Sequence, residues 1–129
     1  MYILIMCLLL ACILPYIMKI PMSIAMQKQP GGYDNHNPRT QAENLTGFGA
    51  RALAAHKNSF ESLLVFAIAV LTALTTQHVT IAIQNLSILY VVTRIVYNIF
   101  YLLDFAALRS IVWGIGFFAS LSIIWLCLP

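Results

Sequence analysis

The residues of this sequence with the most evident chemical potential are polar side chains inside otherwise apolar segments. Tyr90, Arg94, Tyr97 and Tyr101 follow one another at spacings of four, three and four, which places them on one face of a helix. A charge at the centre of a membrane-spanning helix costs about 2.5 to 3.5 kcal/mol, so such an arginine faces a helix bundle, a partner or water rather than lipid. This face therefore offers arginine and tyrosine side chains to a polar partner.

A second polar face precedes it in the chain. Arg51, Asn58 and Glu61 are spaced by seven and three residues and also share one side of a helix. Because Glu61 is the only acidic residue within an expected membrane span, we expect it to pair with Arg94. A buried ion pair that fixes helix register is the simplest explanation of those two residues. The polar residues it leaves unexplained, which favour a polar ligand, are Arg51, Asn58, Tyr101 and Arg109.

The composition indicates the kind of element that carries these residues. The chain has 129 residues, of which 61% are hydrophobic and only 9% charged, whereas soluble domains carry about 25% charged residues. This balance excludes a soluble globular domain, intrinsic disorder and nucleic-acid binding. At roughly 20 residues per crossing, four helices use about 80 residues and leave little for a second domain. We expect a single all-α domain, an integral membrane four-helix bundle.

Hydropathy and helix-breaking residues set the expected boundaries. Four helices are expected at about 2–18, 47–75, 79–103 and 107–128, with a polar loop at about 19–46 that contains several prolines, glycines and asparagines. No Lys or Arg precedes the first apolar run, so we expect a retained helix rather than a cleaved signal peptide. In the second helix only Ser62 to Thr75 is free of charge. That stretch is too short to cross a bilayer of about 30 Å, so this helix begins in the headgroup region.

The basic residues predict the orientation in the membrane. Five of them, Lys19, Lys28, Arg39, Arg51 and Lys57, lie in or beside the first loop, and Arg109 lies at the last turn. The positive-inside rule then places the loop and the last turn in the cytoplasm and both termini outside.

The three cysteines show no metal-binding or disulfide spacing, and no third ligand accompanies the histidines, so we expect no metal site.

At this point the sequence resembles a known family. The segment GFGARALAAHKNSFESLLVFAIAVLTA, residues 47–73, is similar to the second helix of the MAPEG family, the membrane-associated proteins of eicosanoid and glutathione metabolism. Its R-x-x-x-x-H-x-N-x-x-E pattern, as in microsomal glutathione transferases, is made by Arg51, His56, Asn58 and Glu61. The preceding GGYDNHNPR resembles bacterial members, and the R-x-x-Y-x-x-x-Y arrangement with a following arginine is made by Arg94, Tyr97, Tyr101 and Arg109. The resemblance covers nearly the whole chain.

The resemblance implies a homotrimer in a bacterial inner membrane, with glutathione as co-substrate in clefts between subunits near the cytoplasmic face. The glutathione contacts that it implies are Arg51, Asn58, Glu61 and Tyr97, with Arg94 and Arg39 as further contacts. Arg109 would stabilise the thiolate and Tyr101 would add a hydrogen bond. The second substrate would be an apolar electrophile from the bilayer: an aryl halide, an epoxide or a lipid hydroperoxide.

One departure from the family pattern keeps a second interpretation open. Ala54 stands where many glutathione-binding members have an arginine, two residues before the His or Gln of the motif. A non-catalytic member that binds a lipid or scaffolds a membrane enzyme is the alternative. Tyr101 and Arg109 favour the enzyme, because a lipid binder needs no partner for a thiolate. A small transporter is a third interpretation, disfavoured because no inverted repeat is visible.

Overall fold

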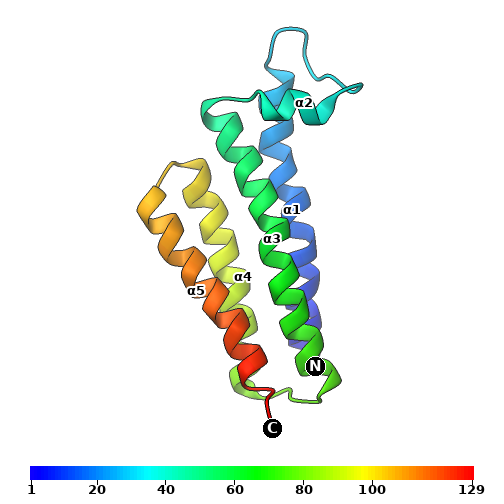
Figure 1. The fold of residues 1–129 in the computed structure, drawn as a ribbon, viewed down its shortest axis with the longest axis vertical. Coiled ribbons are helices and arrows are strands. Elements are labelled where there is room, and N and C mark those ends of the chain that lie inside the picture. Colours follow the sequence, from blue (N-terminus) through cyan, green and yellow to red (C-terminus); the bar gives the residue numbers. More distant parts are fainter.

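The computed structural model describes residues 1–129 as a bundle of helices without strands. Its elements are α1 (Tyr2–Gln27), α2 (Pro38–Glu43), α3 (Gly47–Thr75), α4 (Ile81–Leu102) and α5 (Ala106–Trp125). Four of them, all except the short α2, are long and apolar enough to cross a membrane. They run side by side, and α2 lies across the end of α1 and α3 (Figure 1). The expected all-α membrane bundle with four spans is confirmed.

The first helix is longer than we expected from the sequence. We placed its end near residue 18 and a polar loop at 19–46, but α1 continues to Gln27 and the rest of that segment contains α2. Pro15 and Pro21 lie inside α1, where a proline removes one backbone hydrogen bond, a loss that neighbouring helices make tolerable in membrane bundles. Met18, Met22 and Met26 are buried at a spacing of four, so the packed stripe of α1 continues past the point where charges begin.

The ends of the last two spans differ from the expected ranges by one to three residues. α4 begins after Thr80, whose side chain accepts a hydrogen bond from the backbone N–H of Ile83, as an N-cap does. The turns at the ends of α3 and α4 use positive φ at Gln77 (59°) and Asp104 (64°). Such offsets are usual at helix ends, where the last turn frays.

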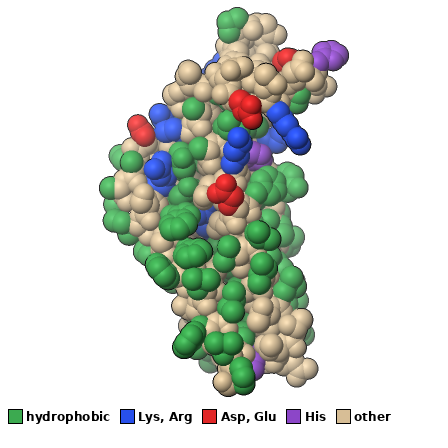
Figure 2. All heavy atoms as spheres, in the orientation of Figure 1, with side chains coloured by type: hydrophobic (Ala, Val, Ile, Leu, Met, Phe, Trp, Pro, Cys, Tyr) green, Lys and Arg blue, Asp and Glu red, His purple; other side chains and the backbone are tan.

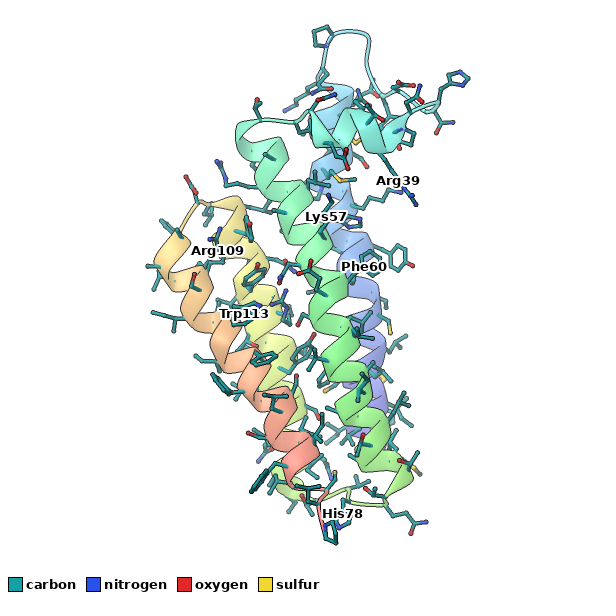
Figure 3. All side chains as sticks on the ribbon, in the orientation of Figure 1. Arg39, Lys57, Phe60, His78, Arg109 and Trp113 are labelled. Carbon is teal, nitrogen blue, oxygen red and sulfur yellow. The ribbon has the colours of Figure 1, made fainter.

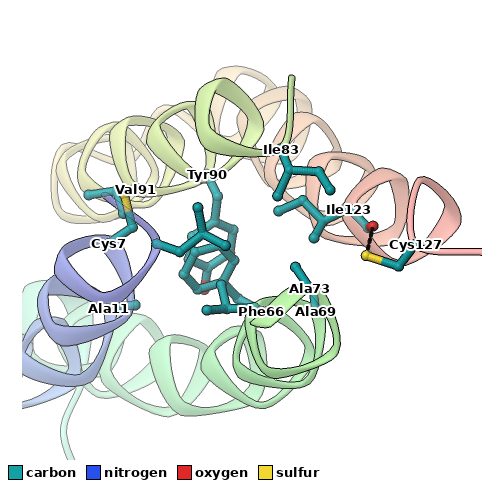
Figure 4. Packing of buried hydrophobic residues seen from close by; sticks show 12 residues of the cluster. Cys7, Ala11, Phe66, Ala69, Ala73, Ile83, Tyr90, Val91, Ile123 and Cys127 are labelled. Atoms are coloured by element: carbon teal, nitrogen blue, oxygen red, sulfur yellow. Dashed lines mark hydrogen bonds between the residues drawn. The ribbon is translucent and has the colours of Figure 1, made fainter. Parts of the chain in front are cut away.

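The apolar core lies in the half of the bundle away from α2. It joins all four spans and contains Leu4, Cys7, Ala11, Phe66, Ala69, Val70, Ala73, Ile83, Tyr90, Val91, Ile123 and Cys127 (Figure 4). At the end of this core that is nearer α2, the rings of Phe66 and Tyr90 stack with centroids 3.8 Å apart. Large apolar side chains such as Leu64 and Phe118, each 65% exposed, cover the outside, as expected of helices that face lipid. Charged side chains gather in the other half, nearer α2 (Figure 2).

Candidate functional site

Arginine and tyrosine side chains form a row along one side of α4 and the start of α5. The guanidinium carbon of Arg94 lies 4.1 Å from the ring centroid of Tyr97, and that of Arg109 lies 4.2 Å from the ring centroid of Tyr101. The two tyrosine rings meet edge to face at 5.5 Å. Spacings of three and four put Arg94, Tyr97 and Tyr101 on one face of α4. The turn to α5 brings Arg109 beside them. The expected polar face of α4 is therefore a continuous cation–aromatic row.

Asn58 on α3 connects this row to Glu61. Arg94 Nη2 donates to the side-chain oxygen Oδ1 of Asn58 at 2.8 Å and to its backbone carbonyl at 3.5 Å. The amide nitrogen Nδ2 of Asn58 in turn donates to Glu61 Oε2 at 3.0 Å. The direct ion pair that we expected between Arg94 and Glu61 is therefore wrong, because the Asn58 amide lies between them. This arrangement leaves the carboxylate at the exposed surface, where it avoids the cost of a buried charge.

Two cavities adjoin this network, and Asn58 and Trp113 line both of them. The first, of about 230 Å³, is lined by Asn58, Tyr97, Tyr101, Arg109, Ser110 and Trp113. The second, of about 180 Å³, lies deeper in the span and is lined by Asn58, Glu61, Ser62, Val65, Trp113, Phe117 and Ser120. One end of this space is thus cationic and polar, and the other end is mainly aromatic and apolar, with the Glu61 carboxylate at its edge. Arg109 and Trp113 lie one turn apart on α5, facing the gap toward α3 (Figure 3).

The fold brings most of the sequence-predicted residues to these cavities. Asn58, Tyr97, Tyr101 and Arg109 meet at the first one, and Glu61 lines the second. The other three predicted contacts, Arg51, Arg94 and Arg39, are not among the residues that line either cavity.

Each of these three arginines has a different environment. Arg94 is only 3% exposed and lies behind the cavity wall, where it holds Asn58. Arg51 lies two helical turns from Asn58 and makes a 3.9 Å salt bridge with the exposed Asp104, yet its Nε–H is buried without a hydrogen-bond partner. Arg39 is on α2, on the other side of α3 (Figure 3). A single chain therefore does not bring Arg39 to the network.

Sequence reasoning missed the aromatic end of the site. Trp113 is not among the site residues that we expected, but it lines both cavities and stacks on Phe117 with ring centroids 5.2 Å apart and planes 6° from parallel. Its position four residues after Arg109 was the available signal, since that spacing keeps two residues on one helix face. Ser62 was also missed, although its hydroxyl meets that of Tyr90 at 2.8 Å.

A close approach of α4 and α5 keeps Arg94 in place. A Cβ added to Gly116 would lie 2.7 Å from Thr93 Oγ1 and 3.8 Å from the Cδ atom of Arg94. A residue without a side chain at this point lets α5 cover the buried arginine, as small residues do at helix contacts in membranes. No group of three or more His, Cys, Asp or Glu side chains lies together in the chain.

Four apolar spans define an integral, multi-pass membrane protein, and this polar cluster with its two cavities lies toward one end of the bundle. The chain belongs to the MAPEG family, whose sequence profile matches residues 3–129. No curated protein and no solved structure matches it. Family membership supports a general function in membrane-bound glutathione or eicosanoid metabolism, and with it an interaction with glutathione.

Proposed function

We propose that this protein is a membrane-bound glutathione transferase, with glutathione peroxidase activity on suitable substrates, in which Arg109 stabilises the glutathione thiolate. The observation that carries the proposal is the position of Arg109. Its guanidinium is stacked on Tyr101 and lines the first cavity, and it makes no salt bridge. An unpaired cation stacked on a phenol ring, in a cavity that also contains Trp113, suits an anionic sulfur.

The other residues match the remaining groups of glutathione, a peptide with two carboxylates, one ammonium and a thiol. Arg51 has a free buried Nε–H, and arginine binds carboxylates through paired donors. Glu61 is exposed and able to accept the ammonium, while Asn58 donates and accepts along a peptide backbone. Tyr97 closes the wall of the first cavity.

The required change in thiol acidity is within reach of one arginine. A free thiol with a pKa of roughly 8.5 is only a few per cent thiolate at neutral pH, and the thiolate is the nucleophile. Lowering that pKa by about two units requires roughly 2.7 kcal/mol. A guanidinium about 4 Å from the sulfur contributes about 4 kcal/mol at an effective dielectric of 20, before desolvation. A hydrogen bond from the Tyr101 hydroxyl adds to this.

We propose a homotrimer because one chain supplies an incomplete site. Two of the glutathione contacts that the sequence predicts, Arg39 and Arg51, line neither cavity of their own chain. A neighbouring subunit supplies the missing wall. Arg39 then contacts glutathione only if it comes from a neighbour, since in its own chain it lies across α3.

We further propose that the charged end of the bundle faces the cytoplasm of a bacterial cell. The basic residues that predicted this orientation gather toward the α2 end of the bundle, and both termini lie at the opposite end (Figures 1 and 2). The electrophile enters from the bilayer along the aromatic cavity between α3 and α5. Aryl halides, epoxides and lipid hydroperoxides all suit this route.

The test compares Arg109→Ala with Arg51→Ala in detergent-purified protein. Loss of Arg109 removes transition-state stabilisation, so turnover of an aryl halide falls about a hundredfold or more, while the Kd of glutathione measured by calorimetry changes far less. Loss of Arg51 weakens binding and leaves saturated turnover nearly unchanged. Full conjugation rates in Arg109→Ala contradict the assigned role.

A lipid-binding or scaffold protein is the alternative function. Its support is Ala54, which stands on α3 where an arginine would give glutathione a further cation. Absence of calorimetric binding at millimolar glutathione would favour this alternative over the transferase.

A further inference from the structure

A separate cavity lies on the other side of α3, enclosed by α1, α2 and α3. It has a volume of about 340 Å³ and is lined by Lys19, Met22, Met26, Tyr33, Pro38, Arg39, Ala42, Glu43, Leu53, His56 and Lys57. None of these residues lines the cavities beside Arg109. Apart from Arg39, which would contact glutathione from a neighbouring subunit, the proposed transferase gives no role to the residues of this cavity.

The charge around this cavity is unbalanced. Three cations, Lys19, Arg39 and Lys57, converge on it from three helices, and Glu43 is the only carboxylate in its lining. None of the three makes a salt bridge, since the single one in the chain joins Arg51 to Asp104. Like charges held together without counter-ions raise the local positive potential and favour an anionic ligand.

The lining is also amphipathic. Met22 and Met26, both buried, and the half-buried Leu53 provide apolar walls on the α2 side of Lys19 and Lys57. The ring of His56 is fixed in place, because its Nδ1 lies 2.8 Å from the carbonyl oxygen of Pro15, to which it donates. The cavity therefore combines an anion-attracting rim with apolar surface, which a small inorganic anion would not use.

Aromatic side chains mark the level of the cavity in the membrane. One helical turn from Lys19 and Lys57 toward the apolar half, Tyr16 and Phe60 meet edge to face at 5.7 Å. They are 64% and 41% exposed, as is typical of the aromatic belt between headgroups and acyl chains. Arg39, Lys57 and Phe60 succeed one another in this direction (Figure 3).

We propose that this cavity binds the phosphate headgroup of an anionic phospholipid. The phosphodiester lies among Lys19, Arg39 and Lys57, and the acyl chains descend over Tyr16 and Phe60 along α1 and α3. Basic pockets between membrane helices recognise anionic headgroups in this way. A soluble phosphate would have no use for the aromatic exit, which is why the lipid is favoured.

The experiment measures lipid binding to the purified full-length protein by native mass spectrometry. The probe is dioleoyl phosphatidylglycerol, compared with dioleoyl phosphatidylcholine, which has the same acyl chains and no net charge, and with free glycerol 3-phosphate. Each cation near an anionic lipid surface contributes about a fivefold change in affinity. Lys57→Gln and Arg39→Gln should each weaken phosphatidylglycerol binding by about that factor. Lys28→Gln is the matched control, because it removes an exposed lysine at the end of α1 that does not line the cavity.

Four results would overturn the proposal. Equal binding of both phospholipids by the wild-type protein excludes an anionic headgroup site, even if no variant folds. An equal loss in Lys28→Gln and Lys57→Gln indicates general electrostatic attraction. Binding of free glycerol 3-phosphate as tight as that of phosphatidylglycerol indicates a soluble phosphate ligand. Loss of glutathione affinity without loss of lipid affinity in Arg39→Gln assigns the cations to the glutathione site of a neighbouring subunit.

Discussion

Arg94 is buried behind the wall of the proposed glutathione site, and its replacement separates binding from chemistry. Arg94→Met removes the donors but keeps a long side chain in the space beneath Gly116. The lost interaction is the 2.8 Å hydrogen bond from the guanidinium to Asn58 Oδ1. Hydrogen bonds to charged groups contribute about 1.5 to 3 kcal/mol, equivalent to about ten- to 150-fold in a binding constant.

Because this hydrogen bond is already made in the free protein, its loss weakens binding only through the orientation of Asn58, and we expect the Kd of glutathione to rise by about tenfold, and by no more than about 150-fold, in Arg94→Met. Turnover at saturating glutathione should remain within about threefold of the wild type, because Arg109 and Tyr101 remain stacked. Arg94→Lys keeps one charged donor and should recover part of the affinity. Calorimetry gives the Kd, and steady-state conjugation of an aryl halide gives kcat.

A double-mutant cycle with Asn58→Ala tests whether Arg94 acts through Asn58. If it does, Arg94→Met combined with Asn58→Ala binds glutathione no more weakly than Asn58→Ala alone. Additive losses would show that Arg94 acts on the ligand by another route. A fall in kcat equal to the fall in kcat/KM would also refute the reasoning, since it would place Arg94 in the transition state. Thermal unfolding in detergent shows whether each variant is folded.

Three further predictions concern packing and the cation at the end of the site. Gly116→Ala should destabilise the bundle by about 1 to 3 kcal/mol, because the new Cβ would lie 2.7 Å from Thr93 Oγ1. Gly114→Ala is the control with no expected loss, because nothing lies within 4 Å of a Cβ at that position. Thermal unfolding in detergent compares the two variants. Tyr90→Phe removes the 2.8 Å hydrogen bond to Ser62 and should cost about 0.6 kcal/mol in reversible unfolding; a loss above 2 kcal/mol would mean that the hydroxyl has a further partner. Asp104→Asn removes the carboxylate partner of Arg51 in a pair whose side chains are 30% and 67% exposed, so stability should change by less than about 1 kcal/mol. Glutathione affinity should stay equal or rise, because Arg51 no longer has to exchange Asp104 for a glutathione carboxylate. A weaker affinity would exclude Arg51 as a carboxylate ligand.

The fold and the general position of the site could be predicted from the sequence. Long apolar runs, with Arg94 as the one charge deep in the third, are sufficient to predict the spans and a polar bundle interior, because an unpaired charge in lipid is costly. Helical spacing alone put Arg94, Tyr97 and Tyr101 on one face. These inferences depend on one helix at a time, which is what periodicity describes well.

The contacts between helices could not be predicted in the same way. Asn58 and Glu61 share a face of α3 and lie about 4.5 Å apart along its axis, so spacing could not show which of them meets Arg94. That choice depends on the axial offset of α3 against α4, which is set by packing such as the Phe66–Tyr90 stack. Arg39 lies outside the spans on α2, where no periodicity relates it to the rest.

The three arginines around the proposed site have different electrostatic environments, and this difference supports one role for each. Arg94 is buried, and its charge is directed at the polar oxygens of Asn58, so it orients a ligand-binding group. Arg51 is half-exposed and already faces a carboxylate, Asp104, which is the group it would exchange for a glutathione carboxylate. Arg109 alone has neither a carboxylate partner nor a hydrogen bond to another side chain, and it contacts only an aromatic ring. Because a cation neutralised by a protein carboxylate would do little for a thiolate, Arg109 is the one whose charge remains available to the sulfur.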